Sequence, residues 1–442
     1  MYLTGGVVRR NNPLYLEASR DLNLAFRKFP CIIVFCFSEV DVINALKYAI
    51  SECIPFRIRS GRHDYEANSN VNRGLVIDIS NINYTFIDRI NNTAKLGGGI
   101  TNGKMYSDLI SKGYTIPAGT CKDTGLCGLT TCGGVGFASR LLGLSCDNLL
   151  EVELINYEGK KIVANECCND NLFWAVRGGL ASNFGVVVSL TYKITPVCDV
   201  STYVITWDSK YFIDIVELWQ ELTPHADVRL TTTVVYEKDP CGDILLSSQG
   251  QFFGSTEELE CIIRPLINVA PTKSVEIECV PYREAIEMWN IGCPTPQKFK
   301  ATGSFIYEPL NRCILKSLED KMINSPKNYR RFYEFIGLNG NVSDIDPNDT
   351  AFVHRDSLYL LEVESVWTLN RYREDNINWT NSVKALLDHV GIGTYRGFTD
   401  FHIIDWENQY YGDNYPRLRE VKTEYDPLNI FKFPQSIEPF SI

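Results

Sequence analysis

The stretch from Arg57 to Tyr65, RIRSGRHDY, gathers ionisable side chains around one glycine. It contains His63, one of only five histidines in the chain. Histidine is the side chain whose charge changes near neutral pH, so its position behind a glycine turn raises the question of a chemical role. The local sequence alone favours a histidine that is simply satisfied within a turn, and the rest of the chain has to decide.

A second stretch is rich in glycine. It begins at Gly119 and places six glycines among residues 119–136. Glycine lets the backbone approach a ligand closely, and exposed N–H groups in such turns bind phosphate. The pattern contains no GxxxxGK[ST], and Gly134-Val135-Gly136 lacks the third glycine of GxGxxG. The stretch therefore supports neither a P-loop nor a Rossmann dinucleotide site.

Composition limits the functions to which these stretches can belong. The 442 residues are enough for two domains, and 45% hydrophobic and 22% charged residues are typical of a folded globular protein. A net charge of -11 disfavours nucleic acid and anionic membranes as partners, because phosphates would be repelled. Neither an export signal nor an apolar run long enough to cross a bilayer is visible, which predicts a cytoplasmic protein.

Fifteen cysteines are a high number for such a chain. Several lie in apolar runs such as Cys31 to Phe37, where cysteine behaves as a small hydrophobe, so we expect reduced core thiols. There is no CxxC pair and the histidines are scattered, which predicts no metal site.

Hydrophobic periodicity indicates the elements that must position these stretches. Ser38 is a plausible N-cap for a helix that continues to residue 50. Strands are expected at residues 31–37, 55–59, 75–79 and 94–99. Strands interleaved with helices predict a mixed α/β domain. In the middle third, we expect strands at 228–236 and 244–253 and amphipathic helices at 212–221 and 256–267.

Five motifs in this order resemble the berberine-bridge-enzyme-like flavin oxidoreductases, whose FAD-binding domain is of the p-cresol methylhydroxylase or vanillyl-alcohol oxidase type. They are RSGRHDY, AGTCKDTGLCGLTTCGGVGF, GLSCDNLLEVELI, NLFWAVRGGLASNFGVV and YYGDNYPRLREVKTEYDPLNIFKFPQSI. The resemblance runs from about Arg20 to Ile437 and is weakest in the middle third. It implies an α+β fold with three parts. These are a two-subdomain FAD-binding domain at 1–198, a substrate-binding domain with an antiparallel sheet and flanking helices at 199–402, and a segment at 403–442 that returns to the FAD domain.

The resemblance also implies covalently bound FAD. Members attach the 8α-methyl group to the histidine of an RSGGH motif, and many attach C6 to the cysteine of an AGxC motif; His63 and Cys121 occupy these positions. The alternative for Cys121 is an ordinary buried thiol. The other implied FAD contacts are Arg59, Ser60, Gly61, Arg62, Asp64, Thr124, Gly125, Gly128 and Leu129 at the pyrophosphate, Gly185 and Val187 on the adenosine or phosphate side, and Tyr411 and Asn414 near the flavin. Arg62, Cys127 and Cys132 stand where the family prefers glycine, and Leu129 where histidine is common.

The usual catalytic base of the family is missing. Carbohydrate-oxidising relatives often use a tyrosine shortly before the YYG motif, but residues 399–405 read TDFHIID. Glu362 aligns with a substrate-facing position of a family strand, and period-two alternation puts Glu364 on the same face. Burial and mutual repulsion would raise the pKa of such a pair, unless the carboxylates face solvent or pair with an arginine. His402 and Tyr65 are the other candidate bases.

The resemblance implies oxidation of a small molecule by hydride transfer to flavin N5. Gln249 and Gln251 could hydrogen-bond substrate hydroxyl groups, although a solvated sheet face is the commoner setting for such residues. Thr124, three residues after Cys121, is a position that decides access of oxygen in the family, and its size favours an oxidase that uses O2. The leading prediction is a bicovalent FAD oxidase of a sugar, oligosaccharide or secondary-metabolite alcohol. Alternatives are oxidative cyclisation or dehydrogenation of an amine or polyketide-like metabolite, a dehydrogenase with another acceptor, and a catalytically silent flavoprotein.

Overall fold

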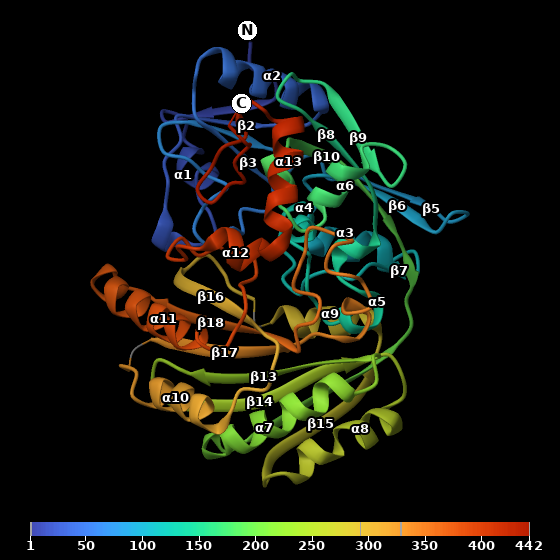
Figure 1. The fold of residues 1–442 in the computed structure, drawn as a ribbon, viewed down its shortest axis with the longest axis vertical. Coiled ribbons are helices and arrows are strands. Elements are labelled where there is room, and N and C mark those ends of the chain that lie inside the picture. The colour runs from blue at the N-terminus through green and yellow to red at the C-terminus, as the bar shows by residue number, and fades with distance from the viewer. Residues whose placement is uncertain (1, 292, 328, 442) are drawn as a thin grey trace.

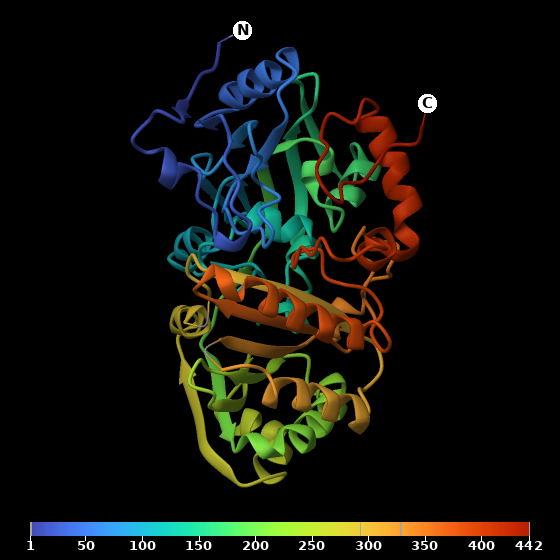
Figure 2. The same ribbon diagram turned by 90° about the vertical axis from the view of Figure 1, so that its left-hand side faces the viewer.

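The computed structural model describes residues 2–291, 293–327 and 329–441. Two parts are stacked along the long axis of the molecule, and both chain termini lie at the upper end (Figure 1). The upper part contains two small sheets, and the lower part is built on one large sheet. Figure 2 shows that the C-terminal segment returns to the side of the upper part. The combination of helices with mainly antiparallel sheets confirms the predicted α+β fold class.

The first sheet carries the chain to the His63 stretch. It contains β1 (Gly6–Arg9), β2 (Ile32–Phe35), β3 (Phe56–Arg59) and β4 (Leu75–Asp78) in the order β1-β2-β4-β3, with β2, β4 and β3 parallel. Helix α2 (Glu39–Ser51) packs on β2 and β4. As predicted, Ser38 caps this helix, and its side chain and that of Asp41 form a capping box. A short helix α1 (Tyr15–Ala18) lies beside the sheet.

The second sheet positions the glycine-rich stretch. Its antiparallel strands are β5 (Thr85–Asp88), β6 (Thr93–Gly97), β10 (Val186–Lys193), β8 (Leu149–Ile155) and β9 (Lys161–Asn165), in that spatial order. The helices around it are α3 (Asn102–Ile110), α4 (Leu126–Thr131), α5 (Ser139–Leu142) and α6 (Asp170–Val176). A two-stranded pair, β7 (Tyr114–Thr115) and β11 (Thr195–Pro196), flanks this part.

The large sheet of the lower part has seven antiparallel strands. In spatial order they are β15 (Thr272–Val280), β12 (Val200–Trp207), β14 (Ile244–Phe252), β13 (Leu230–Lys238), β17 (Arg330–Gly337), β18 (Tyr359–Trp367) and β16 (Lys298–Ile306). The expected strands and helices of the middle third are present. Helices α7 (Phe212–Leu222), α8 (Thr256–Asn268), α10 (Arg312–Ile323) and α11 (Arg373–Leu387) cover its outer face. The other face is turned toward the upper part.

Two helical segments join the parts. Helix α9 (Tyr282–Asn290) follows β15, and its Tyr282, Ala285 and Ile286 pack into the core of the upper part. Helices α12 (Trp406–Tyr411) and α13 (Tyr415–Tyr425) belong to the returning C-terminal segment, and α13 packs against α6. Among the described residues, none of the helices combines the length and apolar character needed to span a membrane.

A buried ion triad also joins the parts. The ammonium group of Lys300 on β16 pairs with the carboxylates of Glu66, just after the His63 stretch, and Asp400, in the C-terminal third. The Lys300 side chain is fully buried, and the carboxylates are almost fully buried. Removing one partner of such a cluster leaves uncompensated charge in a poorly solvated place, which is costly.

We expect Lys300→Met to lower the free energy of unfolding by about 3–5 kcal/mol, because two buried carboxylates lose their cation. Lys316→Met is the matched control. The exposed Lys316 pairs with Glu319 and Asp320, and because its charge is well solvated its loss should cost less than about 1 kcal/mol. Urea unfolding, monitored by tryptophan fluorescence, measures the free energy of unfolding of both variants. Equal shifts in the two variants would contradict a structural role for the triad.

Candidate active site

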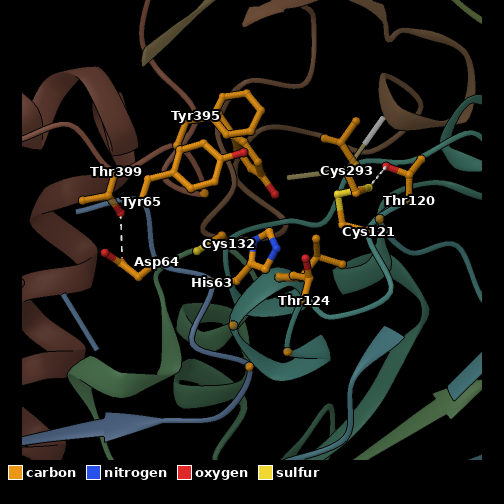
Figure 3. Close-up of a pocket in the computed structure, with 18 of the residues that line it drawn as sticks. His63, Asp64, Tyr65, Thr120, Cys121, Thr124, Cys132, Cys293, Tyr395 and Thr399 are labelled. Atoms are coloured by element: carbon orange, nitrogen blue, oxygen red, sulfur yellow. Dashed lines mark hydrogen bonds between the residues drawn. A yellow bond between two sulfur atoms is a disulfide. The ribbon is translucent and has the colours of Figure 1, made fainter. Parts of the chain in front are cut away.

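A cavity of about 710 Å³ lies between the upper part and the large sheet. The His63 stretch, the loop before α4, the inner sheet face and the segment 395–399 all contribute to its wall. Figure 3 shows side chains from these segments around the cavity. A cavity of this size, with an apolar wall and a few converging polar groups, is typical of a cofactor and substrate site.

The loops on the upper side of the cavity fit a bulky, phosphate-bearing cofactor such as FAD. A Cβ atom added to Gly61 would lie only 2.1 Å from the backbone nitrogen of Gly125, so the His63 stretch and the loop before α4 touch through bare backbone. Gly128, on α4, lines the cavity, and a Cβ there would meet no atom within 4 Å. Close backbone packing and open space beside it are what a tightly held ligand needs.

Arg396 supplies a second indication that a ligand belongs there. Its guanidinium group is nearly fully buried, lines the cavity, and lies 5.0 Å from the centre of the Tyr410 ring. Nη1 donates a hydrogen bond to Thr399 Oγ1 at 2.8 Å, whereas Nε and Nη2 have no hydrogen-bond partner within the described part of the chain. Buried donors of this kind are costly unless paired, so they suit carbonyl or phosphate oxygens of a bound cofactor.

His63 lines the cavity and is partly buried. Burial lowers the pKa of its imidazole to about 4, and the nearby charge of Asp123 opposes this only in part. The ring is therefore neutral at pH 7 and keeps a free nitrogen lone pair. Such a nitrogen can form a covalent bond to a cofactor.

Arg62 occupies the position where a glycine was expected. Its φ angle is 59°, in the left-handed region that favours glycine. The guanidinium group extends toward Glu17 and Asp78, with Nη1 donating to the Glu17 carbonyl oxygen at 3.3 Å and Nη2 lying 3.7 Å from Asp78 Oδ2. The charged end of Arg62 therefore has partners in the surrounding protein, although the residue also borders the cavity.

Four carboxyl groups line the cavity from the large sheet, and Glu237 on β13 is one of them. Glu362 and Glu364 lie on β18, and Glu334 on β17 is the direct cross-strand partner of Glu362. Burial, followed by repulsion from Glu364 and Glu334, raises the pKa of Glu362 well above its usual range. The pKa of Glu364 is raised to about 8 and that of Glu334 to about 7, each mainly by burial. Carboxyl groups of this kind can bind and release a proton near neutral pH.

Tyr65 connects the His63 stretch to this carboxyl cluster. Its hydroxyl group donates a hydrogen bond to Glu362 Oε1 at 3.2 Å. Its ring stacks on Phe398, with 5.4 Å between the ring centres, and meets Phe299 edge to face. Burial and the neighbouring glutamates raise the pKa of the phenol well above its usual value, so Tyr65 stays protonated and orients Glu362.

Arg330, which lies beside these carboxyl groups, already has a partner. Arg330 makes a two-pronged contact with Glu237, at 2.8 and 2.9 Å. Its charge lowers the pKa values of Glu334 and Glu364, but less than burial raises them. The predicted alternative of a carboxylate neutralised by its own arginine therefore applies to Glu237 rather than to Glu362 or Glu364.

Cys121 differs from the expectation of reduced thiols. It lines the cavity but forms a disulfide with Cys293, which follows α9 (Figure 3). The Cα atoms of the pair are 5.4 Å apart. A sulfur in a disulfide cannot also bond to flavin C6, so this state of the protein leaves only His63 for covalent attachment. The expectation of buried thiols also fails for eight other cysteines, which are exposed: Cys53, Cys167, Cys168, Cys198, Cys241, Cys261, Cys279 and Cys313.

Most of the predicted site residues come together at the cavity. Those in its lining are His63, Cys121, Ser60, Gly61, Arg62, Asp64, Tyr65, Thr124, Gly125, Gly128, Leu129, Gly185, Val187, Gln249, Glu362 and Glu364. Asp64 accepts a hydrogen bond from the Thr399 hydroxyl group at 3.2 Å, which ties the His63 stretch to the segment near the C-terminus.

The other predicted residues lie outside the lining, each for a local reason. The Arg59 side chain is buried against Asp78 at 2.8 Å, and the Asn414 amide donates to two backbone carbonyl groups. Tyr411 is fully buried among aromatic rings. Gln251 accepts a hydrogen bond from Trp289 Nε1 at 3.0 Å, which covers it. His402 is half exposed beside Asp400, so the structure offers no support for it as the base.

Among the wall residues that sequence reasoning missed are Glu334, Cys293, Tyr395 and Arg396. Tyr395 accepts a hydrogen bond from the backbone N–H of Gly134 at 3.1 Å and so holds the glycine-rich stretch. Glu334 shares its face of β17 with Phe332 and Ile336, which also line the cavity, and this period-two pattern was a usable signal. For Cys293 and Arg396 there was no comparable signal.

Comparisons with known proteins agree with this architecture. A family model described as a FAD binding domain matches residues 30–165, and one described as berberine and berberine like matches residues 394–438. The FAD-linked oxidoreductase YgaK of Bacillus subtilis is 37% identical over 99% of this chain and 97% of its own length. The structure of BBE-like 1 from Physcomitrella patens superposes with a TM-score of 0.91 at 26% identity, covering 99% of this chain and 97% of that one. A chitooligosaccharide oxidase, at 22% identity, has the same fold, with a TM-score of 0.89 over 99% of this chain and 98% of its own.

The chain is therefore an enzyme of the FAD-linked oxidoreductase class. Within that class it belongs to the berberine-bridge-enzyme-like family, as the match to both family models and the close relative show.

Gly128 offers a test of where the cofactor lies. Because a side chain there meets open space and α4 favours residues other than glycine, we expect Gly128→Leu to fold with unchanged or slightly higher thermal stability. The new side chain should enter the cavity and reduce FAD content by tenfold or more, measured from flavin and protein absorbance. Ser107→Leu, on an exposed position of α3, is the control and should keep full FAD content. A fully loaded Gly128→Leu protein would contradict this placement.

Proposed function

We propose that the chain is a FAD-dependent oxidase of a hydroxylated small molecule, such as a sugar, an oligosaccharide or a secondary-metabolite alcohol. When bound, FAD supplies N5 as the acceptor of a hydride from the substrate C–H bond. The observation that carries the proposal is the pair formed by Glu362 and Tyr65 at the cavity. A chitooligosaccharide oxidase with the same fold is consistent with an alcohol substrate.

In this proposal Glu362 is the general base. Its carboxylate accepts the proton of the substrate hydroxyl group as the adjacent C–H bond breaks, while Tyr65 holds the carboxylate by donating to Oε1. The raised pKa of Glu362 makes it a stronger proton acceptor once ionised. Gln249, which lines the same wall, can hydrogen-bond other substrate hydroxyl groups.

His63 attaches FAD covalently in this proposal, and Cys121 adds a second bond when its sulfur is free. The neutral imidazole of His63 supports the first bond. The backbone of Ser60, Gly61 and Asp64 and the N-terminal turn of α4, including Gly125 and Gly128, would hold the phosphates of FAD.

Oxygen is the proposed electron acceptor. Thr124 lines the cavity three residues after Cys121. It is close in size to valine and smaller than the bulky branched residues that would block the approach of oxygen to a flavin. Formation of H2O2 when oxygen is readmitted to the reduced protein separates an oxidase from a dehydrogenase that uses another acceptor.

The carboxyl cluster favours a second candidate function, the oxidation or oxidative cyclisation of an amine. Glu334, Glu362 and Glu364 face the cavity, whereas the nearby Arg330 is engaged with Glu237. Ionised carboxylates without a cation of their own attract a protonated amine. Anaerobic mixing with a panel of neutral alcohols and of amines decides between the two functions, because only a substrate bleaches the flavin.

We expect Glu362→Gln to slow flavin reduction by about 10² or more, measured by anaerobic stopped-flow absorbance with any substrate found in the panel. In the wild type the rate should rise with pH through the raised pKa of the cluster, because the base acts only when deprotonated. The variant should lose this rise. The control is Glu319→Gln, on the far side of the large sheet. An unchanged rate and pH profile in Glu362→Gln would exclude it as the base.

Covalent attachment predicts that acid-precipitated protein stays yellow and carries one FAD per chain by intact mass. Cys121→Ala should retain one covalent FAD through His63, and the His63→Ala, Cys121→Ala double variant should release all of it on precipitation. Cys127→Ala, a buried cysteine in the same cavity wall, is the control and should match the wild type. A colourless wild-type pellet would refute covalent attachment.

A further inference from the structure

The disulfide at the cavity wall joins two segments that are far apart in the chain. Cys121 belongs to the loop before α4, in the FAD-binding part, and Cys293 follows α9 in the substrate-binding part, 172 residues later. Both residues line the cavity and both are partly exposed, so small molecules can reach the sulfur atoms. Figure 3 shows the pair among the same lining residues as Thr124 and His63.

Other contacts hold the two segments together without the disulfide. The backbone N–H of Lys122 donates to Asn290 Oδ1 at 3.0 Å, and the Lys122 ammonium group pairs with Glu287 on α9. Phe137 stacks on Trp289 with 4.3 Å between ring centres. When the disulfide is reduced, these contacts keep the two thiols adjacent. The pair can therefore close and open again without refolding the domain interface.

The sulfur of Cys121 thus has two alternative partners. One is Cys293, and the other is C6 of the flavin in the proposed attachment. We propose that Cys121 and Cys293 form a redox-active pair that determines whether FAD is held by one covalent bond or by two. The inference rests on the proposed function, because it requires that Cys121 can reach the flavin.

The exchange is balanced by an ordinary thiol-disulfide reaction. Closing the pair converts two protein thiols and one low-molecular-weight disulfide into the protein disulfide and two low-molecular-weight thiols, so two electrons and two protons pass to the oxidant. A thiol reductant reverses the reaction. Only the open pair leaves the Cys121 sulfur free to act as a thiolate, the form of cysteine that bonds to carbon. Its attack on flavin C6 would form the C–S bond, release the C6 hydrogen as a proton and leave two electrons on the flavin, which O2, the proposed acceptor, would remove as H2O2.

The test expresses the wild type and Cys293→Ala in a reducing and in an oxidising host compartment. Free thiols are alkylated in denatured protein, and mass spectrometry identifies the disulfide-linked and FAD-carrying peptides. A closed pair removes two of the fifteen cysteines from alkylation, whereas a flavin thioether removes one. Cys293→Ser serves as a second variant if the alanine protein folds poorly, and Cys127→Ala is the matched control.

In the wild type, we expect the fraction of protein with a Cys121 thioether to fall at least tenfold in the oxidising compartment, as the Cys121 to Cys293 disulfide appears. Cys293→Ala should carry the thioether in both compartments, and Cys127→Ala should behave like the wild type. A Cys293 that is fully alkylated in both compartments, or an equal thioether fraction in both, would overturn the redox pair.

The same experiment separates this inference from the proposed attachment. If Cys293→Ala lacks the thioether in both compartments, Cys121 does not bond to the flavin, and both the second attachment and its redox control are refuted. If FAD is absent from the His63 peptide as well, the proposed covalent attachment itself has failed, whatever the state of the disulfide.

Discussion

The alternation of side chains along the seven-stranded sheet is the constraint on which the site depends. On β18, Leu361 and Val363 point to the helices of the outer face, so Glu362 and Glu364 must point to the cavity. A slip of one residue would place the carboxyl groups in the hydrophobic core and leucine and valine in the cavity. The packing of α7, α8, α10 and α11 therefore fixes the register that presents the carboxyl groups to the cavity.

Burial of the carboxyl cluster disfavours its ionised form and so raises the pKa values of its members. An ionised carboxylate away from water is costly, and three neighbours that repel one another raise the cost further. Arg330 offsets only part of this cost, because its Nε and Nη2 groups donate to Glu237. The remaining cost appears as raised pKa values, about 7 for Glu334 and about 8 for Glu364. Such interacting groups release protons as a set, so Glu362 and its neighbours act as one proton reservoir.

Local sequence patterns allowed much of the secondary structure to be predicted. They did not show which residues far apart in the chain lie side by side in the fold. The Ser38 cap and the strands around it depend on residues a few positions apart, and they lie within about two residues of the expected bounds. Glu362 was predicted from a motif, and Glu364 from the period of two that places it on the same face. Cys293 and Arg396 reach the cavity only because α9 and the C-terminal segment cross over to it, and no local spacing encodes such a crossing. The Arg59 side chain ends β3 beside Asp78, and a buried ion pair there satisfies its charge within the sheet, so any contact with the cofactor is left to its backbone.

The two possible bonds of Cys121 have different mechanical consequences. The upper and lower parts of the molecule meet through the Lys300 triad on one side of the cavity and through α9 on the other. A closed disulfide strengthens the α9 side, because it ties Cys293 to the loop that carries Cys121. A flavin thioether would instead strengthen the attachment of the cofactor. The interface at α9 would then be held by the contacts of Lys122 with Asn290 and Glu287. In this proposal the Cys121 sulfur can therefore restrain either the interface between the two parts or the position of the cofactor, but not both at once. The choice also alters the wall beside Thr124, where oxygen would have to reach the flavin.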